Sequence, residues 1–449
     1  MQFQLTSDFI AQITQLIAKK DGNALRELLQ DIHFADIAEL IGELKSDQAI
    51  YLVKQLESDL TSEALMELDD DVREKILERL SPKEIAAELQ ELDTDDAADI
   101  IAELDETTQQ KVIDKIEDQE RAADIVELLN YDEDTAGALM AKELVQVKET
   151  WTVAGCVREM RRQAENVTRV HSIYVTNKEG KLTGRLSLKD LLTAEAKTKI
   201  SDVFIPKVDY VTVHTENEEV ARIMRKYDLE AIPVVDQQGI LVGRITIDDI
   251  VDFIKDEAEK DYQMAAGISQ DVEADDSILD LTKARLPWLV LGLIGGLGSV
   301  YIMRGYDEAL ATHVELFFFT PLIAAMAGNV GVQSSAIIVQ GLANDNVKGS
   351  LFKRLLKEVG LALINGLALG LLVVLFGVLS SMDQKVAFTI AISMLLVIIV
   401  AALIGTFVPI ILDKKGIDPA IATGPFITTS NDIFGIFLFF FIAKMILNF

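Results

Sequence analysis

Long apolar runs occupy the C-terminal part of the chain, and shorter hydrophobic repeats precede them. Each run is long enough, as a helix, to cross a hydrocarbon core about 30 Å thick. We therefore predict a five-helix membrane domain over residues 281–449. Basic residues gather at the flanks that face the cytoplasm if the N-terminus lies inside, which predicts a C-terminus outside. The predicted helices span about 286–303, 316–343, 359–382, 386–412 and 419–445.

The pattern before residue 130 is helical and repetitive. The segments DIAELIGEL from Asp36 and EIAAELQEL from Glu84 place apolar residues at helical spacing, with polar connectors between them. A stack of short helices produces this pattern. Residues 1–130 are therefore predicted to form an all-α, superhelical N-terminal domain.

Residues 173–251 contain one segment twice: IYVTNKEGKLTGRLSLKDLL aligns without gaps with IPVVDQQGILVGRITIDDIV at an offset of 59. Each copy fits a strand, a glycine turn, a second strand and a helix that begins at Ser187 or Thr246. Repetition at this period predicts two homologous α+β units, residues 131–200 and 201–257, that pack together. The pattern resembles a pair of CBS domains.

Charge divides the chain near residue 280. Residues 1–280 hold 63 acidic and 31 basic residues, a net of −32, and the remainder holds 9 and 11, a net of +2. The N-terminus lacks the pattern of a signal peptide and Cys156 is the single cysteine, so we expect the acidic part to lie in the cytoplasm. The chain shows no nucleophile–base pair, Walker loop or metal-hydrolase motif. We therefore expect neither an enzyme nor a nucleic-acid partner.

Carboxylates crowd the segment that leads into the membrane domain. Residues 258–280 are predicted to form an acidic connecting helix, and the acids between 248 and 261 occupy about four helical turns. Divalent cations would relieve their repulsion, and the same applies to Asp95 and Asp99 in the N-terminal domain. Carboxylate oxygens suit Mg²⁺ and Ca²⁺, whereas the scarcity of Cys and His argues against Zn²⁺ or Cu⁺. A solvated acidic face is the alternative interpretation.

Asp432 is the one ionisable residue between Pro419 and Ala443. A carboxylate facing lipid costs several kcal/mol, so such a group usually faces a bundle interior or a wet cavity. At helical spacing it shares a face with Thr428 and Thr429. This arrangement predicts an ion path.

The second apolar run carries a further polar motif, PLIAAMAGNVGVQSS. Gly328 permits a close backbone approach, and Asn329 and Gln333 place two amides on one face. These amides either hydrogen-bond to neighbouring helices or line a pore.

Taken in order, these elements resemble the MgtE family of bacterial magnesium channels or transporters over the whole chain, with MAGNVGVQ and GPFITTSND as its specific motifs. The resemblance implies a homodimer in the bilayer of the cytoplasmic membrane, with a pore on its two-fold axis lined by the second and fifth helices. It also implies that the cytosolic half senses Mg²⁺ and closes the pore when the ion is abundant.

The resemblance also assigns roles to residues. Asp432 is the pore carboxylate, and Asn329, Gly328, Thr428 and Thr429 lie in the pore motifs. In CBS pairs the Ser/Thr-x-x-Asp element often binds an adenosine ribose, which makes Thr246 and Asp249 candidates for ATP or another adenine nucleotide; an ordinary helix cap is the alternative. Tyr174 of the first copy departs from the pattern, since the second copy has Pro233. The sensing region contains Asp95, Asp99, Asp228, Asp249, Asp252, Asp256, Glu257 and Glu259.

Mg²⁺ gives up water reluctantly, so a site of one or two carboxylates with hydroxyls and carbonyls selects the ion and still releases it. One Asp432 from each subunit would supply two charges on a shared axis. Two other classes stay open: an ion-coupled divalent-cation carrier in which Asp432 titrates, and a non-transporting sensor of divalent ions or adenine nucleotides.

Overall fold

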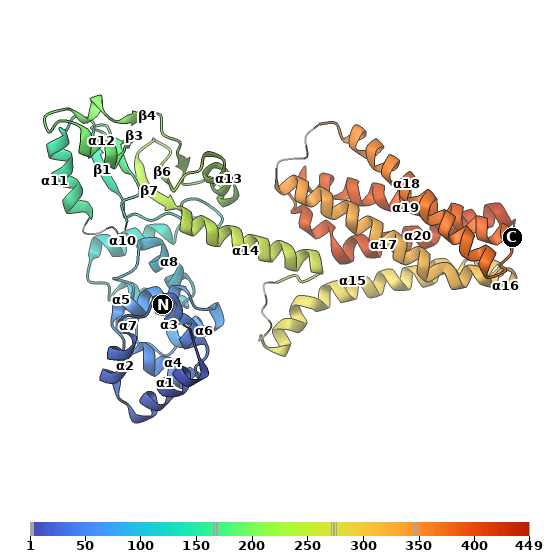
Figure 1. Cartoon of the computed structure of the whole chain (residues 1–449), viewed down its shortest axis with the longest axis horizontal. Coiled ribbons are helices and arrows are strands. Elements are labelled where there is room, and N and C mark those ends of the chain that lie inside the picture. Colours follow the sequence, from blue (N-terminus) through green and yellow to red (C-terminus); the bar gives the residue numbers. More distant parts are fainter. Residues whose placement is uncertain are drawn as a thin grey trace. The chain divides into compact units, whose positions relative to one another are not determined.

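The computed structural model describes residues 4–164, 167, 169–270, 272, 274, 276–344, 347 and 349–448. It divides into two compact units, Met1–Ile254 and Lys255–Phe449. Helix α14 (Ile247–Ala266) begins in the first unit and ends in the second. Figure 1 shows short helices in blue, two small sheets mainly in green, and long helices from yellow to red.

The N-terminal domain is a series of short helices that bury their apolar faces against one another. Ile37, Leu40 and Ile41 of one helix are fully buried in this core. Polar residues cap the helices. Ser81 and Glu84, for example, form a capping box at the start of the helix Pro82–Glu88. The predicted all-α domain is confirmed. The helices are α1 (Ser7–Lys19), α2 (Gly22–Leu29), α3 (Phe34–Gly42), α4 (Ser46–Val53), α5 (Ser58–Met66), α6 (Asp70–Leu77), α7 (Pro82–Glu88), α8 (Thr94–Ala102), α9 (Glu106–Ile113) and α10 (Gln119–Leu128).

The two repeat copies form two small sheets. In each, a parallel pair is followed by an antiparallel pair, β1–β2–β3 in the first and β5–β6–β7 in the second. The turn glycines Gly180 and Gly239 have φ of 87° and 82°, and each accepts a hydrogen bond from the other copy. The elements are β1 (Val145–Lys148), α11 (Val153–Gln163), β2 (Ile173–Thr176), β3 (Leu182–Leu186), α12 (Leu188–Thr193), β4 (Ile205–Pro206), β5 (Val211–Thr212), α13 (Asn217–Tyr227), β6 (Ala231–Val235) and β7 (Leu241–Thr246).

The second unit contains the five predicted apolar helices, each long enough to span a membrane. Helix α19 packs against α17, α18 and α20 and contributes much of the buried core. The helices extend beyond the apolar runs because polar residues continue the same hydrogen-bond ladder outside the apolar stretch. They are α15 (Ile278–Arg304), α17 (Val314–Ala343), α18 (Leu351–Leu379), α19 (Gln384–Asp413) and α20 (Gly424–Leu447), with the short α16 (Asp307–Thr312) and a 3-10 turn, Pro419–Ala422.

The connecting helix differs from the prediction of a helix over residues 258–280. The acidic segment is the second half of α14, which begins at the end of β7, and the helix ends at Ala266. Gly267 follows with φ of 82° and donates its N–H to Met264 O, so a glycine ends the helix although acidic residues continue beyond it. The next helix, α15, begins at Ile278, and residues 271, 273 and 275 lie outside the described part.

Candidate ion pathway and acidic junction

Asp432 lies on α20 where this helix passes α17. A β-carbon at Gly328 of α17 would lie 3.2 Å from Thr428 Cγ2 and 3.9 Å from Asp432 Oδ1. The glycine therefore lets the α17 backbone approach the carboxylate closely. The structure thus brings together three residues that the sequence proposed, Gly328, Thr428 and Asp432.

This region contains a carboxylate without a hydrogen-bond partner among the described residues, and two exposed amides. Asp432 is half-buried, and its carboxylate has no hydrogen-bond or ion-pair partner among the described residues. Asn329 and Gln333 lie exposed on α17. Amides and a carboxylate in contact with lipid are costly, so this surface requires water, an ion or another subunit.

The neighbours of Asp432 on α20 do not act as one polar face. The Thr428 hydroxyl donates to Gly424 O at 2.9 Å within its own helix. Thr429 instead packs against α15, where its methyl group fills the space beside Gly295. Pro425 lies against Gly267, just after α14. The spacing of these residues in the sequence does not show that α20 packs against a different helix on each side.

Three polar groups that sequence analysis missed lie deeper in this unit. Ser334 of α17 donates to Glu358 Oε1 of α18 at 2.6 Å, and Ser335 donates to Ala422 O at 2.5 Å, just before α20. Asn431 is 1% exposed, and neither its amide nitrogen nor its oxygen has a hydrogen-bond partner among the residues that the structure describes. The sequence signal for Asn431 is its position next to Asp432. The contacts of Ser334 and Ser335 join segments that are far apart in the chain, so their partners are not evident from the sequence.

The end of α14 lies against the start of α20. Gly424 has φ of 44°, and a β-carbon there would lie 2.1 Å from Ala265 O. A β-carbon at Gly267 would lie 2.3 Å from Pro425 Cγ. Because contacts this close exclude larger residues, the last turn of the acidic helix and the first turn of the Asp432 helix form one packed joint.

A second acidic group lies in the first unit, where α8 meets the start of α14. We call this group the acidic junction; it comprises Asp93, Asp95, Asp96, Asp99 and Asp249. Burial, together with the surrounding carboxylates, raises the pKa of Asp95 well above its ordinary range and that of Asp96 to about 8. Burial also raises the pKa of Asp99 to about 6 and, against hydrogen bonds from Thr246, that of Asp249. The junction therefore favours protons or cations.

Asp249 also caps α14. Its Oδ2 accepts the N–H of Thr246 at 2.9 Å and the Thr246 hydroxyl at 2.7 Å. The Thr-x-x-Asp element is therefore a helix cap in this structure, the alternative that the sequence left open. Both residues keep their candidacy for a nucleotide, because a cap and a ribose contact use the same side chains.

The remaining predicted sensing acids are not gathered at the junction. Asp252, Asp256 and Glu259 are exposed along α14, and Glu257 is half-buried. Asp228 ends α13 with φ of 54° and lines a cavity of about 330 Å³ with Arg225 and Glu230. Within the described residues, no three His, Cys, Asp or Glu side chains are placed to hold a metal ion.

Comparison with known proteins matches the N-terminal domain, both repeat copies and most of the membrane domain. Family models match residues 32–134 as the MgtE intracellular N domain, 136–197 and 200–256 as CBS domains, and 320–442 as a divalent cation transporter. The magnesium transporter MgtE of Bacillus subtilis is 35% identical over 322 residues, 72% of this chain and 71% of the relative. The chain belongs to the MgtE family. The magnesium transporter MgtE of Thermus thermophilus is 35% identical over 324 residues, 72% of each chain.

Solved structures resemble the cytosolic part. The cytosolic domain of the Mg²⁺ channel MgtE in complex with ATP is 36% identical, with a TM-score of 0.52, and covers 54% of this chain and 99% of that one. The soluble part of a magnesium transporter is 30% identical, with a TM-score of 0.51, and covers 56% and 98%. The predicted family and fold class are therefore confirmed, and both relatives are magnesium transporters.

Proposed function

We propose that this MgtE-family chain is a homodimeric Mg²⁺ channel that admits Mg²⁺ to the cell through a pore on the dimer axis. The observation that carries the proposal is Asp432, a carboxylate that has no partner among the described residues and lies against Gly328 beside exposed amides. A second subunit would bring two carboxylates to one axis. Two charges and the nearby amides suit a divalent ion that keeps part of its hydration shell.

Exposed apolar side chains on the CBS pair support the dimer. Leu188 and Leu192 of α12 are 43% and 80% exposed, and Val251 and Ile254 of α14 are 55% and 43% exposed. These residues repeat at helical spacing on equivalent helices of the two copies, and an isologous contact would bury them. Such a contact would add a cytosolic interface to the one in the membrane.

The dimer should be visible by mass. In detergent, the particles formed by the full-length protein should have twice the mass of one 49.6 kDa chain. Leu192→Asp should weaken the cytosolic contact by placing charge in it, without touching the membrane helices. A chain that is monomeric in detergent and in lipid nanodiscs, yet still conducts Mg²⁺, would exclude a shared pore.

Gating follows from the joint between α14 and α20. Cations that neutralise the acidic helices would favour a compact cytosolic half, and α14 would transmit this state to the start of the Asp432 helix through Ala265 and Gly424. Internal Mg²⁺ therefore closes the pore. The cytosolic domain of the solved relative is in complex with ATP. An adenine nucleotide at the CBS pair of this chain would act on the same half through Thr246 and Asp249.

The gating proposal predicts a change in protease accessibility around Gly267. Millimolar Mg²⁺ should protect this segment, because docking of α14 holds Gly267 against Pro425. Replacing Asp252, Asp256, Glu257 and Glu259 by their amides should alter the Mg²⁺ dependence but leave Mg²⁺ flux in liposomes. Equal cleavage with and without Mg²⁺ would contradict the gating mechanism while leaving the pore untouched.

The single experiment that tests the function is Mg²⁺ flux in liposomes with purified protein. A channel gives resolvable single openings, whereas an ion-coupled carrier turns over too slowly for them. Absence of flux would favour the sensor instead. Labelling of single cysteines placed after Lys444 would show whether the C-terminus lies outside, as the distribution of basic residues indicates.

A further inference from the structure

One buried cation already lies at the acidic junction. Arg244 of β7 is 4% exposed, and its Nη2 lies 3.1 Å from Asp93 Oδ2, at the residue that precedes α8. Its Nη1 donates to Arg169 O at 3.1 Å, and its Nε has no hydrogen-bond partner within the described part of the chain. A buried guanidinium is retained at this depth only if nearby acids compensate its charge.

The main chain fixes Arg244 in this position. Its N–H donates to Ala141 O at 2.9 Å, and its carbonyl accepts the N–H of Ala141 at 2.8 Å. The strand and the linker from the N-terminal domain therefore hold the arginine from both sides. This pairing fixes the main chain of Arg244, and Asp93 and Arg169 O hold its guanidinium at the junction.

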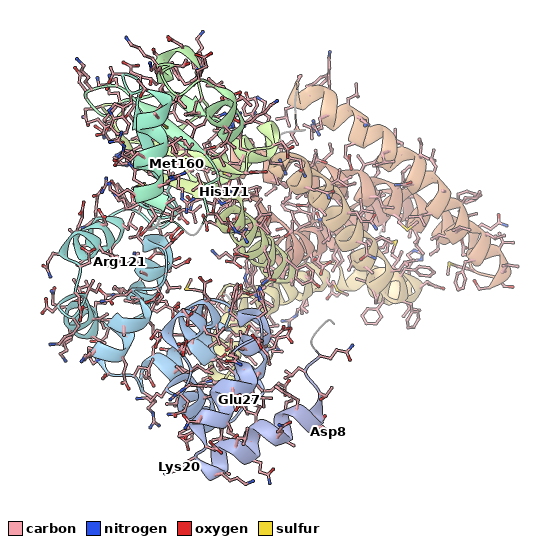
Figure 2. The ribbon with its side chains drawn as sticks, turned by 60° about the vertical axis from the view of Figure 1, so that its left-hand side comes forward. Asp8, Lys20, Glu27, Arg121, Met160 and His171 are labelled. Carbon is pink, nitrogen blue, oxygen red and sulfur yellow. The ribbon has the colours of Figure 1, made fainter. Side chains whose placement is uncertain are left out.

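A second contact, which needs no metal ion, holds the start of α8 on its other side. Glu143 accepts the N–H and the hydroxyl of Thr94 at 3.1 and 2.7 Å, and its other oxygen pairs with Arg121 at 2.9 Å. Figure 2 labels Arg121, which comes from α10 and also donates to Leu89 O. Arg121 and Glu143 thus fix the helix that carries Asp95 and Asp96.

The repeat supplies a comparison. Arg185 occupies the position of Arg244 in the first copy, and each pairs across its hairpin with the aligned residue, Tyr174 or Pro233. Yet Arg185 is exposed. The same residue type at the same register thus meets acids only in the second copy, because α8 docks there.

We propose that Arg244 is a built-in cation of the acidic junction, which takes one of the positions that a divalent ion would otherwise fill and so lowers the Mg²⁺ concentration needed to dock α8. The proposal rests on the proposed gating, and it adds a fixed charge to the regulation by Mg²⁺. Arg244 acts within the acidic junction. It forms an ion pair with Asp93, and its charge acts on Asp249 through space.

The test compares Arg244→Gln with Arg185→Gln in the full chain, which remove the same charge from equivalent positions. Hydrogen exchange of the α8 amides is followed against Mg²⁺ concentration, since the N–H of Thr94 is protected only while α8 is docked on Glu143. Arg244→Gln should raise the half-protecting Mg²⁺ concentration by about tenfold or more, a usual coupling between sites. Arg185→Gln should change it by less than about twofold. Saturating Mg²⁺ should restore full protection in Arg244→Gln, because the ion takes the place of the guanidinium.

A rescue separates this role from damage to the fold. Asp93→Asn combined with Arg244→Gln removes both charges. The double variant should therefore shift the half-protecting Mg²⁺ concentration by less than the two single variants do together. If Arg244→Gln does not fold, Asp93→Asn alone decides: it should shift the half-protecting concentration in the same direction, because Arg244 is then buried without its partner.

Three outcomes would overturn the proposal: no shift in Arg244→Gln, equal shifts in both arginine variants, or loss of protection that Mg²⁺ does not restore. Flux is recorded on the same samples. Absence of Mg²⁺-dependent flux in the parent would refute the proposed gating, and the hydrogen-exchange comparison would still decide the role of Arg244.

Discussion

Asp432→Asn should reduce Mg²⁺ flux in liposomes by at least about a hundredfold, because attraction between unit charges about 4 Å apart amounts to several kcal/mol even at intermediate dielectric. The amide keeps the shape of the side chain and its place beside Gly328. Only the charge that meets the cation is lost. The dimer should assemble as in the parent, since Asp432 has no partner within its own subunit among the described residues.

Asp383→Asn is the matched control. Asp383 caps α19 by accepting the N–H groups of Lys385 and Val386, and asparagine caps helices equally well. The control therefore removes one carboxylate from the same unit without touching the pathway, and its flux should stay within about twofold of the parent because surface charge steers ions only weakly at physiological salt. An Asp432→Asn variant that conducts like Asp383→Asn would show that the ion path lies elsewhere.

The membrane helices and the repeat could be predicted because their signals are local. An apolar run fixes where a helix meets lipid, although not where it ends: α18 begins at Leu351, and it includes Lys353 and Glu358 before its apolar run. Hairpin glycines and the alternation of the strands defined the repeat without any long-range information. For the same reason the end of α14 was missed, since acidic residues continue past the glycine that stops the helix.

The contacts of the site could not be predicted, because they join residues far apart in the chain. Asn431 is buried against Gly331 of another helix, and Ser334 meets a carboxylate of α18. The arginines of the repeat make the point most clearly. Arg185 and Arg244 are equivalent in sequence, and only the docking of α8 distinguishes an exposed side chain from a buried one. Tertiary contact, not local pattern, decides which of two equivalent charges is buried.

The stability of the cytosolic unit should fall as pH rises from about 4 to about 8 when divalent ions are chelated. Burial and nearby acids raise the pKa of Asp96 from 3.8 to about 8. A raised pKa in the folded state means that the folded state binds the proton more tightly than the unfolded state. The stabilisation by that proton is therefore complete below the unfolded pKa and is lost as pH passes the folded one.

Asp96→Asn should remove the Asp96 contribution to this dependence, because the amide is neutral at every pH. In thermal unfolding of the full chain with a chelator, the Tm of the parent's cytosolic transition should be about 5 °C higher at pH 6 than at pH 8. The Asp96→Asn profile should be shallower than that of the parent, and its remaining slope should come from Asp95, Asp99 and Asp249, whose pKa values are also raised. Asp47→Asn, at an exposed first-turn position of α4, should keep the slope of the parent.

Mg²⁺ should act on the same charge as the proton does. Added at pH 8, where the Asp96 carboxylate is about half ionised and Asp99 is largely ionised, the ion should raise the Tm of the parent more than it does at pH 6, because protons and cations compete for the junction. In Asp96→Asn this difference between the two pH values should shrink. A parent whose response to Mg²⁺ is the same at both would show that the ion stabilises the cytosolic half at acids outside the junction, and would direct attention to the exposed carboxylates of α14.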